Sequence, residues 1–322
     1  MKALIFNKKL KFTDVVIPKK GKDDVLVRVT KAGICKTDHE IVKGYVKGFR
    51  GILGHEFIGI VEDSNDKSLI GKRVTSEINF SCNRCEYCLK GLQRHCPNRT
   101  VLGIQNKDGA FAEYVIVPKE NIFILAQNIS DNTAIFIEPL AAALEILDQV
   151  LLNGKNILII GDGKLGLLIA YAINKAVKCN LLIIGKHIEK LNIVKKIGIK
   201  TSLLHNFKAA HQYDIVIEAS GNPDALYLAL QSVKPRGTIV LKSTYASIPK
   251  VNVSDIVVNE VCVVGSRCGR FSEAIKFIKK FKPDFSLFIS KEFPFEKAIE
   301  AFEYSKKHNV IKVLLKMDKN NW

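Results

Sequence analysis

The hexapeptide GDGKLG at residues 161–166 most constrains the fold, because it directly follows an apolar run and precedes an apolar helical pattern at 167–176. This is the spacing G-x-G-x-x-G in the strand, turn, helix context that gives it meaning. Its glycines permit a tight turn, close approach of the backbone to a pyrophosphate, and close packing of helix on strand. The segment therefore predicts a dinucleotide-binding loop with five candidate cofactor-binding residues: Gly161, Gly163, Lys164, Leu165 and Gly166.

The chain around this loop alternates between apolar runs and helical patterns. Short apolar runs occur at 157–160, 181–184, 214–218, 238–241 and 261–265. Such alternation is typical of a parallel sheet covered by helices. We therefore expect an α/β fold, with a doubly wound Rossmann sheet over residues 140–270.

The first 120 residues have a different texture, with short β-type runs punctuated by glycine. This pattern favours an antiparallel, barrel-like domain. After the predicted sheet the sequence returns to helical patterns at 272–281 and 295–307, and it closes with a strand pattern at 312–316. Because 322 residues exceed one typical core, we expect a catalytic domain from 1–139 and 271–322, interrupted by the nucleotide-binding domain.

Four cysteines, Cys82, Cys85, Cys88 and Cys96, are separated by two, two and seven residues. Four thiolates satisfy one tetrahedral Zn²⁺ completely, so such a site is structural. The surrounding segment 79–98 has little apolar periodicity, and a metal would hold its shape. Disulfide pairing is the weaker alternative, because disulfide frameworks belong mainly to small secreted domains.

The formal charge of +17 raises the question of a polyanionic partner. The lysines are spread over the whole chain among acidic neighbours, which favours an ordinary solvated surface and argues against nucleic acid. No apolar stretch approaches the roughly eighteen residues of a membrane span, and the first ten residues lack a signal-peptide pattern. We expect a cytoplasmic enzyme with no membrane partner.

Three further segments, GICKTD at 33–38, GHE at 54–56 and EPL at 138–140, carry groups that bind metals. Together with the four-cysteine lobe, the run DGAFAEY at 108–114 and the glycine loop, they resemble in order the zinc-dependent medium-chain dehydrogenases, the alcohol, sorbitol and threonine dehydrogenase group. The likeness covers nearly the whole chain. It implies a GroES-like catalytic domain beside the Rossmann domain, and a homodimer or homotetramer.

By this resemblance, Cys35 and His55 are ligands of a catalytic zinc, and Glu138 stands where the family supplies a cysteine or glutamate. Glu56 is the alternative ligand. Thiolate, imidazole and carboxylate with one open position describe a catalytic zinc, which makes two zinc ions per chain. The hydroxyl of Thr37 would pass a proton between the substrate oxygen and solvent.

The coenzyme preference depends on the end of the second strand of the sheet. An acidic residue about 20 positions beyond the glycine loop would bind the ribose of NAD, but the chain has Gly185, Lys186 and His187 there. The missing carboxylate removes a repulsion against a 2′-phosphate, and Lys186 can pair with that phosphate. We predict a preference for NADP(H) over NAD(H), the alternative being that Lys186 is an ordinary surface lysine. Arg267 is a further candidate for a phosphate contact, and we expect Asp162 to point away from the pyrophosphate.

These observations predict hydride transfer between a nicotinamide coenzyme and a small alcohol, polyol, aldehyde or ketone. One alternative is a zinc-independent enone or quinone reductase on the same scaffold, against which Cys35, His55 and Glu138 argue. The other is a non-enzymatic nucleic-acid-binding protein, against which the glycine loop argues. The pattern does not identify the substrate or the direction of the reaction.

Overall fold

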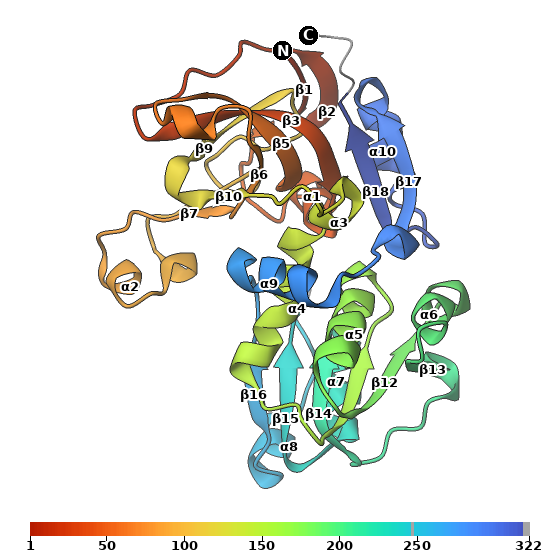
Figure 1. Cartoon of the computed structure of the whole chain (residues 1–322). Coiled ribbons are helices and arrows are strands. Elements are labelled where there is room, and N and C mark those ends of the chain that lie inside the picture. The colour runs from red at the N-terminus through yellow and green to blue at the C-terminus, as the bar shows by residue number, and fades with distance from the viewer. Residues whose placement is uncertain (246–247, 318–322) are drawn as a thin grey trace. The chain divides into compact units, whose positions relative to one another are not determined.

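The computed structural model describes residues 1–245 and 248–317 (Figure 1). The chain divides into two compact units, one formed by Met1–Glu138 with the segment from Ile275 onward, the other by Pro139–Ala274. Among the described residues, no helix has the length and apolar character needed to cross a lipid bilayer.

The first unit is built on β-strands. Its described elements are β1 (Lys2–Asn7), β2 (Lys9–Asp14), β3 (Asp24–Ile34), α1 (Lys36–Val42), β4 (Gly51–Ile52), β5 (Glu56–Ser64), β6 (Arg73–Ser76), β7 (Asn79–Phe80), α2 (Glu86–Leu89), β8 (Thr100–Val101), β9 (Tyr114–Pro118), β10 (Ile122–Ile124), α3 (Asp131–Ala134), β17 (Ile289–Pro294), α10 (Ala298–Tyr304) and β18 (Lys312–Lys316). Two helices, α4 (Ile137–Gln149) and α9 (Phe271–Phe281), start in one unit and end in the other.

The long strand β3 organises this unit. It pairs antiparallel with β5, β9 and β18 in a sheet whose main order is β10-β6-β5-β3-β18-β17. The side chains of Val25, Val27 and Val29 alternate into the core and are fully buried, as expected for a strand with one face toward an apolar interior. At its carboxyl end, Gly33 pairs with Glu56 of β5 and with Leu314 of β18. This register brings the end of β3 and the beginnings of β5 and β18 to the same place.

The second unit is a parallel α/β sheet, which confirms the predicted fold class. Its described elements are β11 (Asn156–Ile160), α5 (Lys164–Ala176), β12 (Asn180–Gly185), α6 (Ile188–Lys195), β13 (Lys200–Leu203), β14 (Tyr213–Glu218), α7 (Asp224–Ser232), β15 (Val233–Leu241), α8 (Val253–Val258) and β16 (Cys262–Gly265). The strand order β13-β12-β11-β14-β15-β16 reverses direction between β11 and β14. Open α/β sheets bind ligands at this switch point, at the carboxyl ends of the strands.

Burial of the strands in the second unit explains why apolar runs in the sequence predicted them. The interior strands are buried on both faces, and residues such as Leu158, Val216 and Ile239 are fully buried. Parallel strands covered by helices on both sides therefore give continuous apolar runs. The one strand of this sheet that the apolar runs do not show is β13, an edge strand with the sequence KTSL and only partial burial.

Candidate catalytic metal centre and coenzyme loop

The side chains of Cys35, His55 and Glu56 converge in the first unit, and their ligand atoms all lie within 4.8 Å of one another. Cys35 follows the end of β3, whereas His55 and Glu56 stand at the beginning of β5. The pairing of Gly33 with Glu56 places these two chain segments side by side. A thiol, an imidazole and a carboxylate at this separation suit Zn²⁺ with metal–ligand bonds of about 2.0–2.3 Å.

Asp38 positions the imidazole of His55. Its carboxylate is fully buried, and Oδ1 lies 3.3 Å from Nδ1 of His55, whose side chain is only 3% exposed. The other oxygen, Oδ2, accepts a hydrogen bond of 2.8 Å from the backbone amide of Cys35. A carboxylate behind one ring nitrogen fixes the orientation of a metal-ligating histidine and leaves Nε2 for the ion.

The charge of the site also favours a cation. Burial disfavours the protonated form of His55, but Asp38 and Cys35 outweigh it and raise its pKa well above the usual value. The negative charges of Asp38 and Cys35 that favour an imidazolium here also attract a metal cation. The donor set and the field of this structure therefore fit zinc.

Glu56 has a second contact, because the ammonium group of Lys312 meets its Oε2 and both side chains are fully buried. Burial lowers the pKa of Lys312 to about 8, against the opposing attraction of Cys35 and Asp38. Gly33 has to lack a side chain here, since a Cβ would lie 3.2 Å from Nζ of Lys312 and closer still to Glu56. The sequence motifs did not identify Asp38 or Lys312 as residues of the site. Asp38 was visible inside the GICKTD segment, but Lys312 had no local signal.

Thr37 and Glu138 occupy different positions relative to this cluster. The Thr37 hydroxyl lies 3.8 Å from Sγ of Cys35, in the first turn of α1. Glu138 lies in the first turn of α4 and is partly buried. Within the described ranges, the cluster of potential ligands contains Glu56 and does not include Glu138.

The four-cysteine lobe forms a second cluster. In Figure 1 the lobe is the segment that contains α2 and extends away from β7. Sulfur atoms of Cys85 and Cys88 are 3.4 Å apart, those of Cys85 and Cys96 3.7 Å, and those of Cys96 and Cys82 3.5 Å. A tetrahedron with Zn–S bonds of about 2.3 Å has edges of about 3.8 Å, so the thiols are spaced for one such ion, and none of them is in a disulfide.

The glycine loop of the second unit connects β11 to α5, as its spacing predicted. Gly161 has a φ of +122°, and a Cβ there would lie 2.8 Å from the backbone of Ser220. Gly163 is the N-cap of α5, and a Cβ on it would meet no atom within 4 Å. Open space above the first amides of the helix is what a pyrophosphate requires, so the loop fits the phosphates of a dinucleotide. Lys164 and Leu165 open the helix and are partly exposed, whereas Gly166 is buried against Gly161.

The end of β12 lies next to this loop. Lys186 is exposed, and His187 keeps 34% of its side-chain surface accessible. Asp162 points from the glycine loop toward them, because its Oδ2 accepts a hydrogen bond of 2.6 Å from the backbone amide of His187 and lies 3.0 Å from the ring nitrogen Nδ1. Arg267 is exposed and follows the carboxyl end of β16. Its backbone carbonyl accepts a hydrogen bond from Nζ of Lys242.

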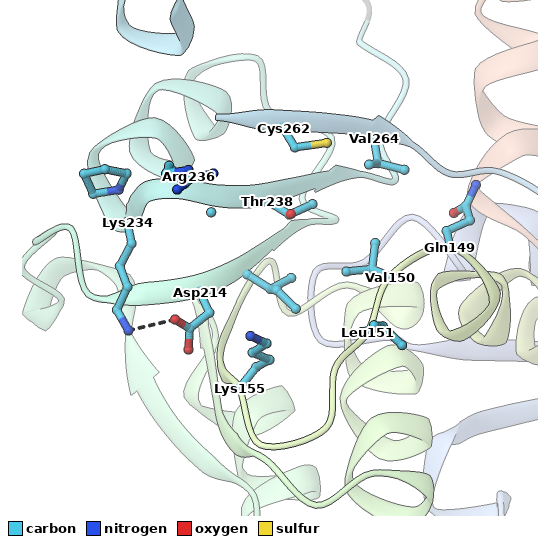
Figure 2. A pocket seen from close by; sticks show the side chains of 13 residues that line it. Gln149, Val150, Leu151, Lys155, Asp214, Lys234, Arg236, Thr238, Cys262 and Val264 are labelled. Carbon is cyan, nitrogen blue, oxygen red and sulfur yellow. Dashed lines mark hydrogen bonds and ion pairs between the residues drawn. The ribbon is translucent and has the colours of Figure 1, made fainter. Parts of the chain in front are cut away.

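A cavity of about 350 Å³ lies at the amino-terminal ends of the strands of the same sheet, opposite the glycine loop (Figure 2). Its walls come from the amino-terminal parts of the strands and from the end of α4. They include Lys155, Thr238, Cys262 and the ion pair of Lys234 with Asp214, in which the charged atoms are 2.7 Å apart. The glycine loop follows the carboxyl end of β11, so this cavity is not part of the coenzyme site.

Comparison with known proteins assigns the chain. Residues 21–127 match the family model of the alcohol dehydrogenase GroES-like domain, and residues 132–317 match that of the glucose dehydrogenase C-terminus. The chain belongs to the zinc-dependent medium-chain dehydrogenase family. This membership confirms the predicted class of enzyme, an oxidoreductase of CH–OH groups that uses zinc and a nicotinamide coenzyme.

Relatives of this medium-chain dehydrogenase span most of its length. An L-threonine 3-dehydrogenase of Chromobacterium violaceum is 32% identical over 251 residues, which cover 72% of this chain and 73% of the relative. A D-arabitol-phosphate dehydrogenase of Enterococcus avium is 29% identical, covering 94% of this chain and 93% of the relative. A zinc-binding dehydrogenase of Sinorhizobium meliloti, solved with bound NADP, superposes with a TM-score of 0.90 at 27% identity and covers 98% of both chains.

Proposed function

We propose that this dehydrogenase oxidises, reversibly and with NADP(H), a small secondary alcohol that carries a neighbouring hydroxyl or amino group. The convergence of Cys35, His55 and Glu56 within 4.8 Å carries the proposal. The substrate class is supported by two relatives, named for L-threonine and for D-arabitol phosphate, in which the oxidised carbon has such a neighbour.

In the proposed site, Cys35 and His55 hold the catalytic zinc, and the third ligand is Glu56 or Glu138. A zinc ion in such a site polarises the substrate oxygen as a Lewis acid. The hydroxyl of Thr37 would exchange a proton with that oxygen, a role supported by its distance of 3.8 Å from Sγ of Cys35. Asp38 keeps the imidazole of His55 in one orientation. Lys312 neutralises the carboxylate of Glu56 when Glu56 is not a zinc ligand. A second zinc belongs to the four thiols of the lobe.

The coenzyme part of the proposal depends on charge at the end of β12. Gly163 and the first turn of α5 receive the pyrophosphate, and Lys186 and His187 receive the 2′-phosphate of NADP(H), with Arg267 as a further phosphate contact. No acidic side chain extends from position 185, where a ribose-binding carboxylate would repel this phosphate. The neighbouring carboxylate of Asp162 accepts a hydrogen bond from His187. The neighbour from Sinorhizobium meliloti was solved with NADP, and an alcohol dehydrogenase of Escherichia coli with a TM-score of 0.91 was solved with NADH, so the assignment rests on the residues at the end of β12.

The proposal includes a homodimer or homotetramer formed in the cytoplasm. β16 is the outer strand of the parallel sheet, and among the described residues no further strand pairs with its outer edge. The nearby helix α8 exposes Val253, Val257 and Val258, with relative exposures of 63%, 70% and 79%. An apolar surface next to an open edge strand favours pairing with a second copy. All eight cysteines are free thiols, as in a reducing compartment.

The test combines metal analysis with kinetics. Purified enzyme should contain two zinc ions per chain and reduce NADP⁺ with a panel of polyols and β-hydroxy amino acids. Cys35→Ser should lower kcat/KM more than about 100-fold, because even the groups behind zinc ligands matter by 10- to 100-fold. Its dissociation constant for NADPH should stay within about twofold of the parent. Full activity of this variant, or of enzyme stripped of zinc, would refute the proposal.

A further inference from the structure

The side chain of Asp162 occupies the space beside the last residue of β12. Gly185 is buried there, and a Cβ built on it would overlap Cβ, Cγ and Oδ2 of Asp162. Position 185 therefore cannot carry any side chain while Asp162 keeps its place. The glycine loop and the end of β12 are sterically coupled through this pair of residues.

Asp162 is held firmly in that place. The residue is 7% exposed, and its Oδ2 accepts the backbone N–H of His187 at 2.6 Å. Both carboxylate oxygens also face Nδ1 of the His187 ring, at 3.2 and 3.0 Å. Hydrogen bonds to a carboxylate are about twice as strong as neutral ones, and a buried carboxylate without them is costly. Moving Asp162 aside would therefore break its hydrogen bonds to His187, which fix the turn at 186–187.

We propose that Asp162 is a specificity-determining residue: it excludes a ribose-binding carboxylate from position 185 and positions His187 beside Lys186 for a 2′-phosphate. The second half rests on the NADP(H) preference proposed above. In dinucleotide-binding sheets an acid at the end of the second strand binds the ribose of NAD, whereas a base nearby accommodates the 2′-phosphate of NADP. In this chain the acidic residue next to the end of β12 is Asp162 of the glycine loop, and its carboxylate oxygens face His187.

A cycle of variants tests the steric half. Gly185→Asp, Asp162→Ala and the double variant are compared by thermal unfolding without coenzyme. Gly185→Asp should lower Tm by about 5 °C or more, since it overpacks a buried site. Adding Asp162→Ala should restore most of this loss. The matched control is Asp162→Asn, which keeps the volume and should not rescue Gly185→Asp. Undiminished stability of Gly185→Asp alone, or simple additivity in the double variant, would overturn the inference.

Titrations of NADPH and NADH fluorescence, without substrate, test the selectivity half. The double variant should shift the ratio of the two dissociation constants at least about tenfold toward NADH, because its new carboxylate accepts from ribose and repels the 2′-phosphate. Asp162→Asn should weaken NADPH and leave NADH within about twofold. If Asp162→Asn weakens NADH instead, Asp162 itself binds ribose and the inference is wrong. A wild-type preference for NADH would overturn the proposed coenzyme, while the unfolding cycle would still decide the steric exclusion.

Discussion

At the scale of single residues, the proposed metal centre would depend on a buried side chain behind one of its ligands. Asp38 is fully buried behind His55 and also accepts the amide of Cys35. We predict that Asp38→Asn weakens catalytic zinc about 10- to 100-fold, because the amide supports the imidazole less strongly than a carboxylate. Competition with a chromogenic chelator measures this affinity. Asp63→Asn, at a half-exposed carboxylate on β5, is the control, and equal zinc affinity in both variants would contradict the role of Asp38.

The buried pair of Lys312 and Glu56 gives a second prediction at this scale. Lys312→Met leaves the carboxylate of Glu56 buried without its cation, which should cost about 3–5 kcal/mol of unfolding free energy. Lys312→Met combined with Glu56→Gln should recover most of that cost, because no charge then remains unpaired. Urea unfolding of the zinc-free protein measures both. A double variant as unstable as the single one would show that the ammonium group is needed for another reason.

At the scale of elements, the four-cysteine lobe has little core of its own, since Tyr87, Leu89 and Leu92 are all exposed. We predict that Cys88→Ser loosens the structural zinc and lowers Tm by several degrees. Its kcat/KM at 20 °C should change less than about threefold, because the lobe's thiols are separate from Cys35 and His55. Measuring zinc content, Tm and activity on one preparation checks this. Loss of activity at full stability would place the lobe in catalysis.

Elements with a strong local pattern were predictable from the sequence, and those defined by tertiary pairing were not. The glycine loop has its own spacing, and the apolar runs of β11, β12, β14 and the end of β15 are largely buried, so the sequence alone predicts them. The apolar run of β16 was also predicted, although most of its residues are exposed at the outer side of the sheet. In contrast, β13 is a polar edge strand, and β17 pairs parallel to β18 with a register shift. At the metal site, Cys35 and His55 stood in motifs, whereas Lys312 reaches Glu56 only through the pairing of β18 with β3.

At the scale of the whole molecule, the proposed assembly depends on two opposing contributions: repulsion between the net charges of the copies and pairing through the outer edge of β16. Each chain has a formal charge of +17, so two copies repel one another when salt is low. Pairing through β16 and the valines of α8 buries apolar surface, which salt does not weaken. We therefore predict that the dimer tightens as NaCl rises from about 10 to 150 mM, where the screening length falls from about 30 to 8 Å.

Light scattering over a range of protein concentrations measures this equilibrium against the monomer mass of 35.9 kDa. Val263→Lys places a cation in the middle of β16, where the wild-type side chain is 40% exposed, and should shift the protein toward monomer at every salt concentration. Ile124→Lys, at a 54% exposed position on β10 of the other unit, adds the same charge without touching that edge and should behave like the parent. If both variants weaken association equally, total charge and not the open strand governs assembly. Dissociation on adding salt would mean that ion pairs hold the copies together, which contradicts an interface built on β16 and α8.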